Sequence, residues 1–255
     1  MVDATLIDRF QADGAVLVRG LLDEAWISSL RDAMADILQR AYDPAERMGV
    51  QPGRTVQSDG MWRDQEAFRR FLFESPLGAV AGAVMRSETV RLYEDLMLYR
   101  EAGADGSASW HRDATYWPLR GEQLSSIWLS LEPVTHDTGA FRVAAGSHRD
   151  PDEVATAPLR DEQVDPDRVR ILTFEAEPGD AVVFHPRILH TAYGSAPDRP
   201  RRTFTIRFTG DDVRWRPRGA YFHPWMQNCG LQRGDVLDHP GFPVVWRADE
   251  LSARH

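Results

Sequence analysis

Residues 107–119, SASWHRDATYWPL, place an imidazole and a carboxylate two positions apart, at His111 and Asp113. In an extended chain, residues i and i+2 point to the same side, and their Cα atoms lie about 6–7 Å apart. Both side chains can therefore reach one metal ion, but the same spacing also suits a plain His–Asp hydrogen bond. The pair alone does not decide between a metal site and a structural contact.

A second group of imidazoles stands in PGDAVVFHPRILH, residues 178–190, which contains His185 and His190. Two histidines and one carboxylate on one side of an ion leave coordination positions open, as in non-haem Fe(II) oxygenases. Taken singly, either histidine is more often a buried structural residue or part of a turn. The residues themselves leave open which of the two would be the third ligand.

The run RRTFTIRF, residues 201–208, alternates in the manner of a strand with two different faces. One face is largely apolar, and the other carries Arg201, Thr203, Thr205 and Arg207. A polar face either meets solvent or lines a barrel interior that holds an anionic cosubstrate. In the second case a guanidinium could bind a carboxylate with two parallel hydrogen bonds.

Composition narrows the class of partner. The 255-residue chain has a formal net charge of −9, which argues against nucleic acid and anionic membranes as partners and favours a small molecule. The single cysteine, Cys229, excludes an internal disulfide and indicates a reducing compartment, which we take to be the cytoplasm. No run of about 18 apolar residues is present, and the N-terminus has no signal-peptide pattern. All 30 basic residues are arginine.

The elements that must position these residues fall into a helical front and a β-rich back. Apolar spacing predicts helices over 4–11, 22–42, 64–75 and 76–85, with a loop over 43–62. Short β-type runs occupy 15–20, 89–103, 123–134, 139–148, 169–180, 181–186 and 201–210. We expect a mainly β fold with flanking α, an antiparallel barrel or jelly roll buttressed by N-terminal helices. The expected division is a single domain, 1–255: a helical buttress (1–90), a β core (91–210) and a C-terminal extension (211–255).

Several segments together resemble a known family. They are IDRFQADGAVLVRGLLDEAWISSLRDAM, VRLYEDLMLYREAG, WHRDATYWPL, SSIWLSLEPVTHDTGAFRVAAGSHR and PGDAVVFHPRILH…RPRRTFTIRF. The chain resembles the phytanoyl-CoA dioxygenase (PhyH-like) family of Fe(II)/2-oxoglutarate-dependent oxygenases over nearly its whole length. The resemblance implies a cupin-like double-stranded β-helix that uses Fe(II), 2-oxoglutarate and O2.

The resemblance also implies roles for particular residues. The iron ligands would be His111, Asp113 and His190, while His185 would not bind metal. Arg201, eleven positions after the distal histidine, would grip the C5 carboxylate of 2-oxoglutarate, and Trp128 would line the cosubstrate site. Relatives often have a serine where this chain has Ala192, so Thr203 or Thr191 is expected to supply that hydroxyl. Because related halogenases lack the aspartate, the presence of Asp113 favours oxygen chemistry.

The expected reaction is hydroxylation of a C–H bond of a hydrophobic small molecule, including tailoring steps such as epimerisation or cyclisation. Trp62, Tyr116, Trp117 and the polar insertion 150–168 are candidates for the substrate pocket or lid, with simple packing or a surface loop as the other reading. Two other classes stay open: a non-catalytic jelly-roll binding protein and a cupin-type enzyme using Zn(II) or Mn(II). The presence of all three ligands counts against the first, and the second would have no need of Arg201.

Overall fold

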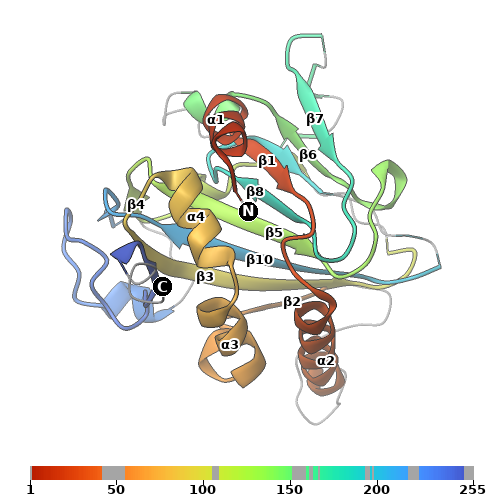
Figure 1. The fold of residues 1–255 in the computed structure, drawn as a ribbon, viewed down its shortest axis with the longest axis horizontal. Helices are drawn as coiled ribbons and strands as arrows, with labels where there is room; N and C mark the ends of the chain where they lie inside the picture. The colour runs from red at the N-terminus through yellow and green to blue at the C-terminus, as the bar shows by residue number, and fades with distance from the viewer. Residues whose placement is uncertain are drawn as a thin grey trace.

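The computed structural model describes residues 2–41, 55–104, 109–150, 159–160, 163–165, 167–192, 196, 198–217 and 224–249. Four helices cover one face of a large antiparallel sheet, and a small sheet lies beyond its other face (Figure 1). This is the mainly β arrangement with flanking helices that the hydrophobic pattern predicts. Within the described residues, no helix is long and apolar enough to cross a membrane.

The helices lie close to where the apolar spacing puts them: α1 spans Ala4–Asp13, α2 Glu24–Ala41, α3 Glu66–Glu74 and α4 Leu77–Met85. Both ends of α1 are defined by capping residues. An oxygen of the Asp3 side chain accepts from the backbone N–H of Leu6, 2.9 Å away, and caps the start. Gly14 ends the helix at φ 80°, a left-handed conformation that glycine adopts without strain.

The large sheet has the strand order β1-β8-β5-β10-β3-β12, with β2 also paired to β3. Its strands are β1 Ala15–Val18, β2 Thr55–Asp59, β3 Thr89–Arg100, β5 Leu124–Ser130, β8 Ala181–Phe184, β10 Arg201–Thr209 and β12 Val244–Arg247. A three-stranded sheet is formed by β7 Ile171–Phe174, β6 Phe141–Ala144 and β9 His190–Thr191. A two-stranded ribbon pairs β4 Leu119–Arg120 with β11 Arg214–Trp215.

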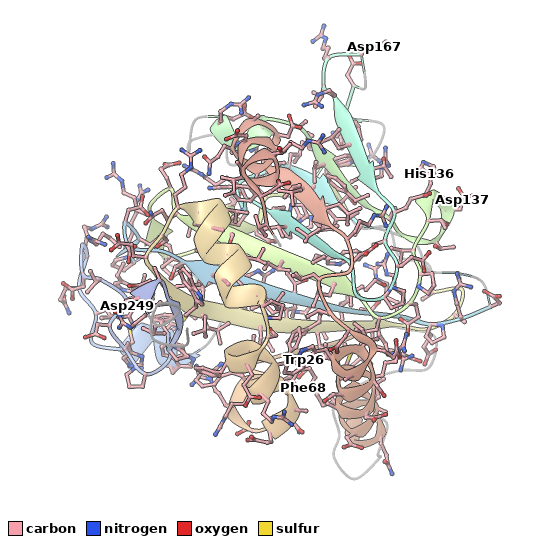
Figure 2. The ribbon with its side chains drawn as sticks, viewed as in Figure 1. Trp26, Phe68, His136, Asp137, Asp167 and Asp249 are labelled. Carbon is pink, nitrogen blue, oxygen red and sulfur yellow. The ribbon has the colours of Figure 1, made fainter. Side chains whose placement is uncertain are left out.

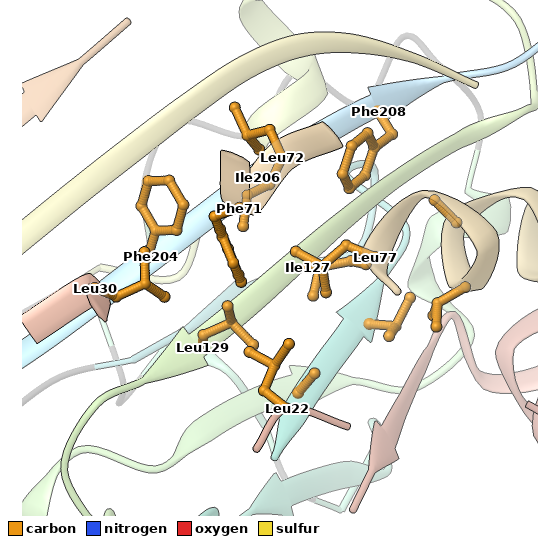
Figure 3. Packing of buried hydrophobic residues seen from close by; sticks show 14 of the residues in the cluster. Leu22, Leu30, Phe71, Leu72, Leu77, Ile127, Leu129, Phe204, Ile206 and Phe208 are labelled. Carbon is orange, nitrogen blue, oxygen red and sulfur yellow. The ribbon is translucent and has the colours of Figure 1, made fainter. Parts of the chain in front are cut away.

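The alternation of β10 divides the two sides of the large sheet. Phe204, Ile206 and Phe208 are fully buried among helix residues such as Phe71 and Leu77 (Figure 3). The alternate residues, from Arg201 to Arg207, face the interior between the two sheets. There Arg201 contacts the segments just before β6 and just after β9, and Arg207 contacts Asp113. The polar face of this strand is therefore an interior face and not a solvated one.

Two short strands at the margins, β2 and β12, depart from the sequence-based prediction. The prediction of a loop over 43–62 is partly wrong, because β2 lies within this range and a 3-10 helix, Met61–Arg63, begins in it. Only Val56 of β2 is buried, so this edge strand lacks the apolar alternation that marks a strand. Strands of the large sheet are also not confined to 91–210, since β1, β2 and β12 belong to it.

Candidate metal centre

His111 and His190 come from segments far apart in the chain that meet as an antiparallel pair. The backbone N–H of each donates to the carbonyl oxygen of the other at 3.0 Å. This pairing places both imidazoles on the same side, with ring centroids 4.3 Å apart. A two-residue β9 is therefore enough to hold the distal histidine beside the proximal one.

Asp113 begins a short 3-10 helix, η2 (Asp113–Tyr116), directly after this paired segment. Its Oδ1 lies 3.5 Å from Nε2 of His111 and 3.8 Å from Nε2 of His190. One ligand atom from each of the three residues falls within 4.8 Å of the other two, and no other group of three metal-ligating side chains is found in the described part of the chain. Two imidazole nitrogens and one carboxylate oxygen thus converge on one point.

Both histidines are held in the tautomer that a metal requires. Nδ1 of His111 lies 2.9 Å from the carbonyl oxygen of Ser109, and Nδ1 of His190 lies 3.0 Å from that of Ile188. A carbonyl oxygen only accepts, so each Nδ1 carries a proton, and in the neutral form of either ring Nε2 has the lone pair that a metal requires. Burial, and then the charge on His111, lowers the pKa of His190 to about 4, so this ring is neutral at pH 7.

The second oxygen of Asp113 is occupied by Arg207. The Nε and Nη2 atoms of this guanidinium lie 3.2 and 3.1 Å from Oδ2, and its Nη1 contacts the carboxylate of Glu94. Burial acts to raise the pKa of Asp113, but the charge on Arg207 and the hydrogen bond of His111 hold it well below its usual range. The carboxylate is therefore ionised and turned so that Oδ1 faces the two imidazoles.

Arg207 and Glu94 are site residues to which the sequence reasoning gave no role. Arg207 was recognised only as a member of the polar face of its strand. The signal that could have found it was the same period of two that singled out Arg201. Glu94 lies opposite Arg207 in the register of β3 and β10, and a charged residue within the run RLYEDLML was the available hint.

Arg112 stands between the two proximal ligands and points the other way. Its guanidinium donates to the carbonyl oxygens of Ser147 and Arg187 and forms an ion pair with Asp150 at 2.6 Å. These contacts tie the segment that carries His111 and Asp113 to the turns after β6 and β8.

Arg201 lies in the same interior and is 3 % exposed. It donates to the carbonyl oxygens of Gly139 and Ala192 at 2.9 and 3.1 Å. Its Nε is buried without a hydrogen-bond partner, and none of the described residues forms an ion pair with it. Burial, and then the charge of Arg100 opposite it on β3, lowers the pKa of Arg201 to about 9. A buried cation of this kind fits an anionic ligand such as the C5 carboxylate of 2-oxoglutarate.

The other two predicted cosubstrate residues also lie in this interior. Trp128 is buried on β5 and packs on Phe141, whose ring stacks on His190 with a centroid separation of 5.2 Å. Thr203 follows Arg201 on the same face and donates through Oγ1 to the carbonyl oxygen of Leu98, 3.3 Å away. Thr191, the other candidate for the missing serine hydroxyl, is fully buried on β9.

The predicted pocket residues are not brought together. Trp62 packs against the helix-side core and near Phe73. Trp117 is fully buried, 4.8 Å from the ring of Tyr93, and lies under the guanidinium of Arg207. The backbone of Tyr116 closes η2, but its side chain lies outside the described residues. Of the insertion 150–168, most lies outside them as well; Leu159 pairs with Trp110, the residue before His111.

The remaining histidines have other partners. In His185, Nε2 lies 3.2 Å from the carbonyl oxygen of Glu122 and Nδ1 accepts from the backbone of Arg187 at 3.1 Å, so neither nitrogen is left for a metal. His136 is exposed beside Asp137 at the surface (Figure 2). His148 and His239 contact nearby backbone, at Gln11 and Gly241 respectively. His223 and His255 lie outside the described residues.

Comparison with known proteins agrees with this centre. The sequence profile described as phytanoyl-CoA dioxygenase (PhyH) matches residues 10–203. The chain belongs to this family. A probable phytanoyl-CoA dioxygenase of Caenorhabditis elegans is 20 % identical over 234 residues, 80 % of this chain and 74 % of the relative.

Solved structures share the fold at low sequence identity. The non-heme alpha ketoglutarate dependent epimerase SnoN from nogalamycin biosynthesis is 24 % identical with a TM-score of 0.78, and 95 % of each chain is covered. The carbocyclase SnoK from the same biosynthesis is 20 % identical with a TM-score of 0.79, over 96 % of this chain and 97 % of the other. SnoN has also been crystallised with Fe3+, alpha ketoglutarate and nogalamycin RO.

These likenesses confirm the predicted fold class, a jelly roll of the cupin type. Family membership and the His–Asp–His cluster together make the chain an Fe(II)- and 2-oxoglutarate-dependent oxygenase. This assignment decides against the two other classes left open by the sequence, a binding protein without catalysis and a Zn(II) or Mn(II) enzyme.

Proposed function

We propose that this PhyH-family oxygenase oxidises a C–H bond of an apolar small molecule, with Fe(II) on His111, Asp113 and His190 and 2-oxoglutarate on Arg201. The observation that carries the proposal is Arg201 itself. It is a buried guanidinium with no ion pair among the described residues, in the same interior as a three-residue metal cluster. A metal hydrolase would not need a buried guanidinium without an ion pair at that place.

Each residue then has a defined task. The two imidazoles offer Nε2 and Asp113 offers Oδ1, while Arg207 keeps the carboxylate ionised and oriented. Arg201 anchors the far carboxylate of the cosubstrate, and Trp128 walls the space beside it. When bound, iron and 2-oxoglutarate supply the activation of O2 that the side chains cannot.

The character of the interior supports an apolar substrate. Leu96 and Leu98 lie opposite Thr205 and Thr203 in the register of β3 and β10, on the interior face. Both leucines are only half-buried, although β10 and β2 flank them on either side. Apolar side chains left partly uncovered inside a barrel fit an apolar ligand.

The class of oxidation is open among hydroxylation, epimerisation and cyclisation, because similar structures include an epimerase and a carbocyclase. Mass analysis of the product distinguishes them. Hydroxylation adds one oxygen atom, epimerisation leaves the mass unchanged, and oxidative cyclisation removes two hydrogen atoms.

The test of the proposal needs no substrate. Anaerobic protein with Fe(II) and 2-oxoglutarate should show a weak visible charge-transfer band, and admission of O2 should give slow formation of succinate. Arg201→Lys should diminish the band at a given 2-oxoglutarate concentration. Equal succinate formation with Zn(II), or no band at saturating 2-oxoglutarate, would contradict the assignment.

A further inference from the structure

A cavity of about 550 Å³ lies at the end of the large sheet where β10 finishes, between the β4–β11 ribbon and the C-terminal segment. Its volume is within the range of small-molecule sites. None of the proposed iron ligands lines it, nor does Arg201. The cavity is therefore a second place where a ligand could bind, separate from the cosubstrate site.

The charge of this cavity is opposite to that of the chain. Five arginines line it against two carboxylates, whereas the chain as a whole carries a formal net charge of −9. Both carboxylates are already engaged. Asp212 accepts from the backbone N–H groups of Glu122 and Gln123 at 2.8 and 3.0 Å, and Glu122 forms an ion pair with Arg187. Four arginines are then left without a carboxylate among the described residues: Arg120, Arg214, Arg216 and Arg233.

The register of the ribbon strengthens the case. Arg120 of β4 and Arg214 of β11 lie directly opposite each other. Like charges in this position repel. The guanidinium of Arg214 donates to the backbone carbonyl oxygens of Asp211 and Val213, whereas an anion bound by Arg120 would offset the repulsion. The same motif occurs at the proposed cosubstrate site, where Arg201 lies opposite Arg100.

The rest of the wall is aromatic and apolar. Trp117 and Trp215 line the cavity, and Trp215 lies opposite Leu119 in the ribbon. Both indoles are 2 % exposed or less, so they form the backing of the wall, and the group that the cavity recognises is an anion on the arginines. Several guanidinium groups favour phosphate over carboxylate, because a phosphate monoester has three acceptor oxygens and nearly two charges, whereas one arginine fork satisfies a carboxylate.

We propose that this cavity binds the phosphate ester of a small organic molecule, with the phosphate on Arg120, Arg216 and Arg233 and the organic part in the rest of the cavity. The lining of this cavity adjoins the metal centre, both in sequence and through side-chain contacts. Trp117 lies under Arg207, which holds Asp113, and Ala114 of the wall follows Asp113.

Phenyl phosphate is a suitable probe, because it joins an aromatic ring to one phosphate monoester. Binding is measured by calorimetry on anaerobic protein loaded with Fe(II) and saturating 2-oxoglutarate, so that the cosubstrate site is filled. We expect saturable one-to-one binding, with Arg216→Gln and Arg233→Gln each weakening it about tenfold, the lower end expected for a charge-assisted contact. Arg9→Gln is the matched control, since Arg9 is an exposed arginine on α1 with no part in the cavity.

Each other outcome overturns the proposal. Absence of saturable binding would show that the cavity holds no phosphate ester. An equal loss in Arg9→Gln would indicate general charge attraction, and a loss confined to Arg201→Lys would place the probe at the cosubstrate site. Tighter binding of benzoate or phenol than of phenyl phosphate would exclude phosphate as the recognised group. Because binding is measured and not turnover, failure here leaves the proposed oxidation untouched.

Discussion

Arg207 holds Asp113 by one oxygen and leaves the other facing the two histidines. Nε and Nη2 of the arginine lie 3.2 and 3.1 Å from Oδ2, while Oδ1 lies 3.5 Å from Nε2 of His111. A carboxylate that rotates freely presents either oxygen to a metal, whereas this one is fixed for one-point contact. Partners of this kind set the orientation of a ligand and the affinity of the site.

Substitution of Arg207 should therefore weaken iron binding. We expect Arg207→Gln to lower Fe(II) affinity by about ten- to a hundredfold, measured by metal titration under anaerobic conditions. Glu94→Gln is the control, because it alters the other partner of Arg207 and leaves the contact with Asp113 in place. If Glu94→Gln reduces affinity as much, the loss reflects damage to a buried network and not the orientation of Asp113.

Arg201 and Arg202 are adjacent on β10, and their side chains lie on opposite faces of the strand. Arg202 forms an ion pair with Glu132 at 2.6 Å, while Arg201 has carbonyl partners only. Charge-assisted hydrogen bonds contribute roughly 1.5–3 kcal/mol, so Arg201→Lys should weaken 2-oxoglutarate about ten- to a hundredfold, read from the charge-transfer band. Arg202→Lys should leave the affinity unchanged. The reverse pattern would put the cosubstrate on the other face of the strand.

The two histidines of the FHPRILH run should separate cleanly by iron content. His190→Ala removes a proposed ligand and should abolish stoichiometric Fe(II) and succinate formation. His185→Ala should retain iron, because both ring nitrogens of His185 already contact backbone groups of Glu122 and Arg187. A stability cost is expected there, since the side chain is buried. Iron loss in His185→Ala with iron retained in His190→Ala would mean that the distal ligand is misassigned.

Local patterns gave part of the candidate site, the family resemblance gave His190, Arg201 and Trp128, and neither reached contacts that depend on strand pairing. The spacing of His111 and Asp113 and the alternation of β10 are periodic features, so the sequence carries them directly. The contact of Arg207 with Glu94 depends on register between strands 113 residues apart in sequence, and that register shifts at a bulge beside Arg207. No local pattern contains such a shift.

The same limit applies at the periphery. Trp62, a candidate for the substrate pocket with simple packing as the other reading, packs on the helix-side core. Trp62 follows β2 in the chain. Only Val56 of this edge strand is buried, so the sequence has no alternation of apolar and polar residues that would place the strand. Burial of an aromatic side chain is a tertiary outcome, and sequence alone gives only the residue type.

Asp95 offers a test of buried charge away from the metal ligands. It is fully buried on β3, accepts from the backbone N–H of Trp62 at 3.1 Å, and its Oδ1 has no partner among the described residues. Burial raises its pKa to about 6, with the charge of Asp59 adding to the effect. The folded state therefore binds the proton more tightly than the unfolded chain, so stability should fall as pH rises from about 4 to 6.

Asp95→Asn keeps an acceptor for Trp62 and removes the charge. The raised pKa corresponds to roughly 3 kcal/mol between its protonation states, so the variant should be more stable than the wild type at pH 8 by up to about that amount. The difference should shrink through pH 4 and vanish near pH 3, below the unfolded-state pKa, where the wild-type carboxyl is protonated in both states. Urea denaturation across this pH range measures it, with Asp64→Asn, an exposed position, as the control for loss of one negative charge. An Asp95→Asn protein that is less stable at pH 8, or a difference that does not change with pH, would show that the carboxylate is not destabilised by its burial.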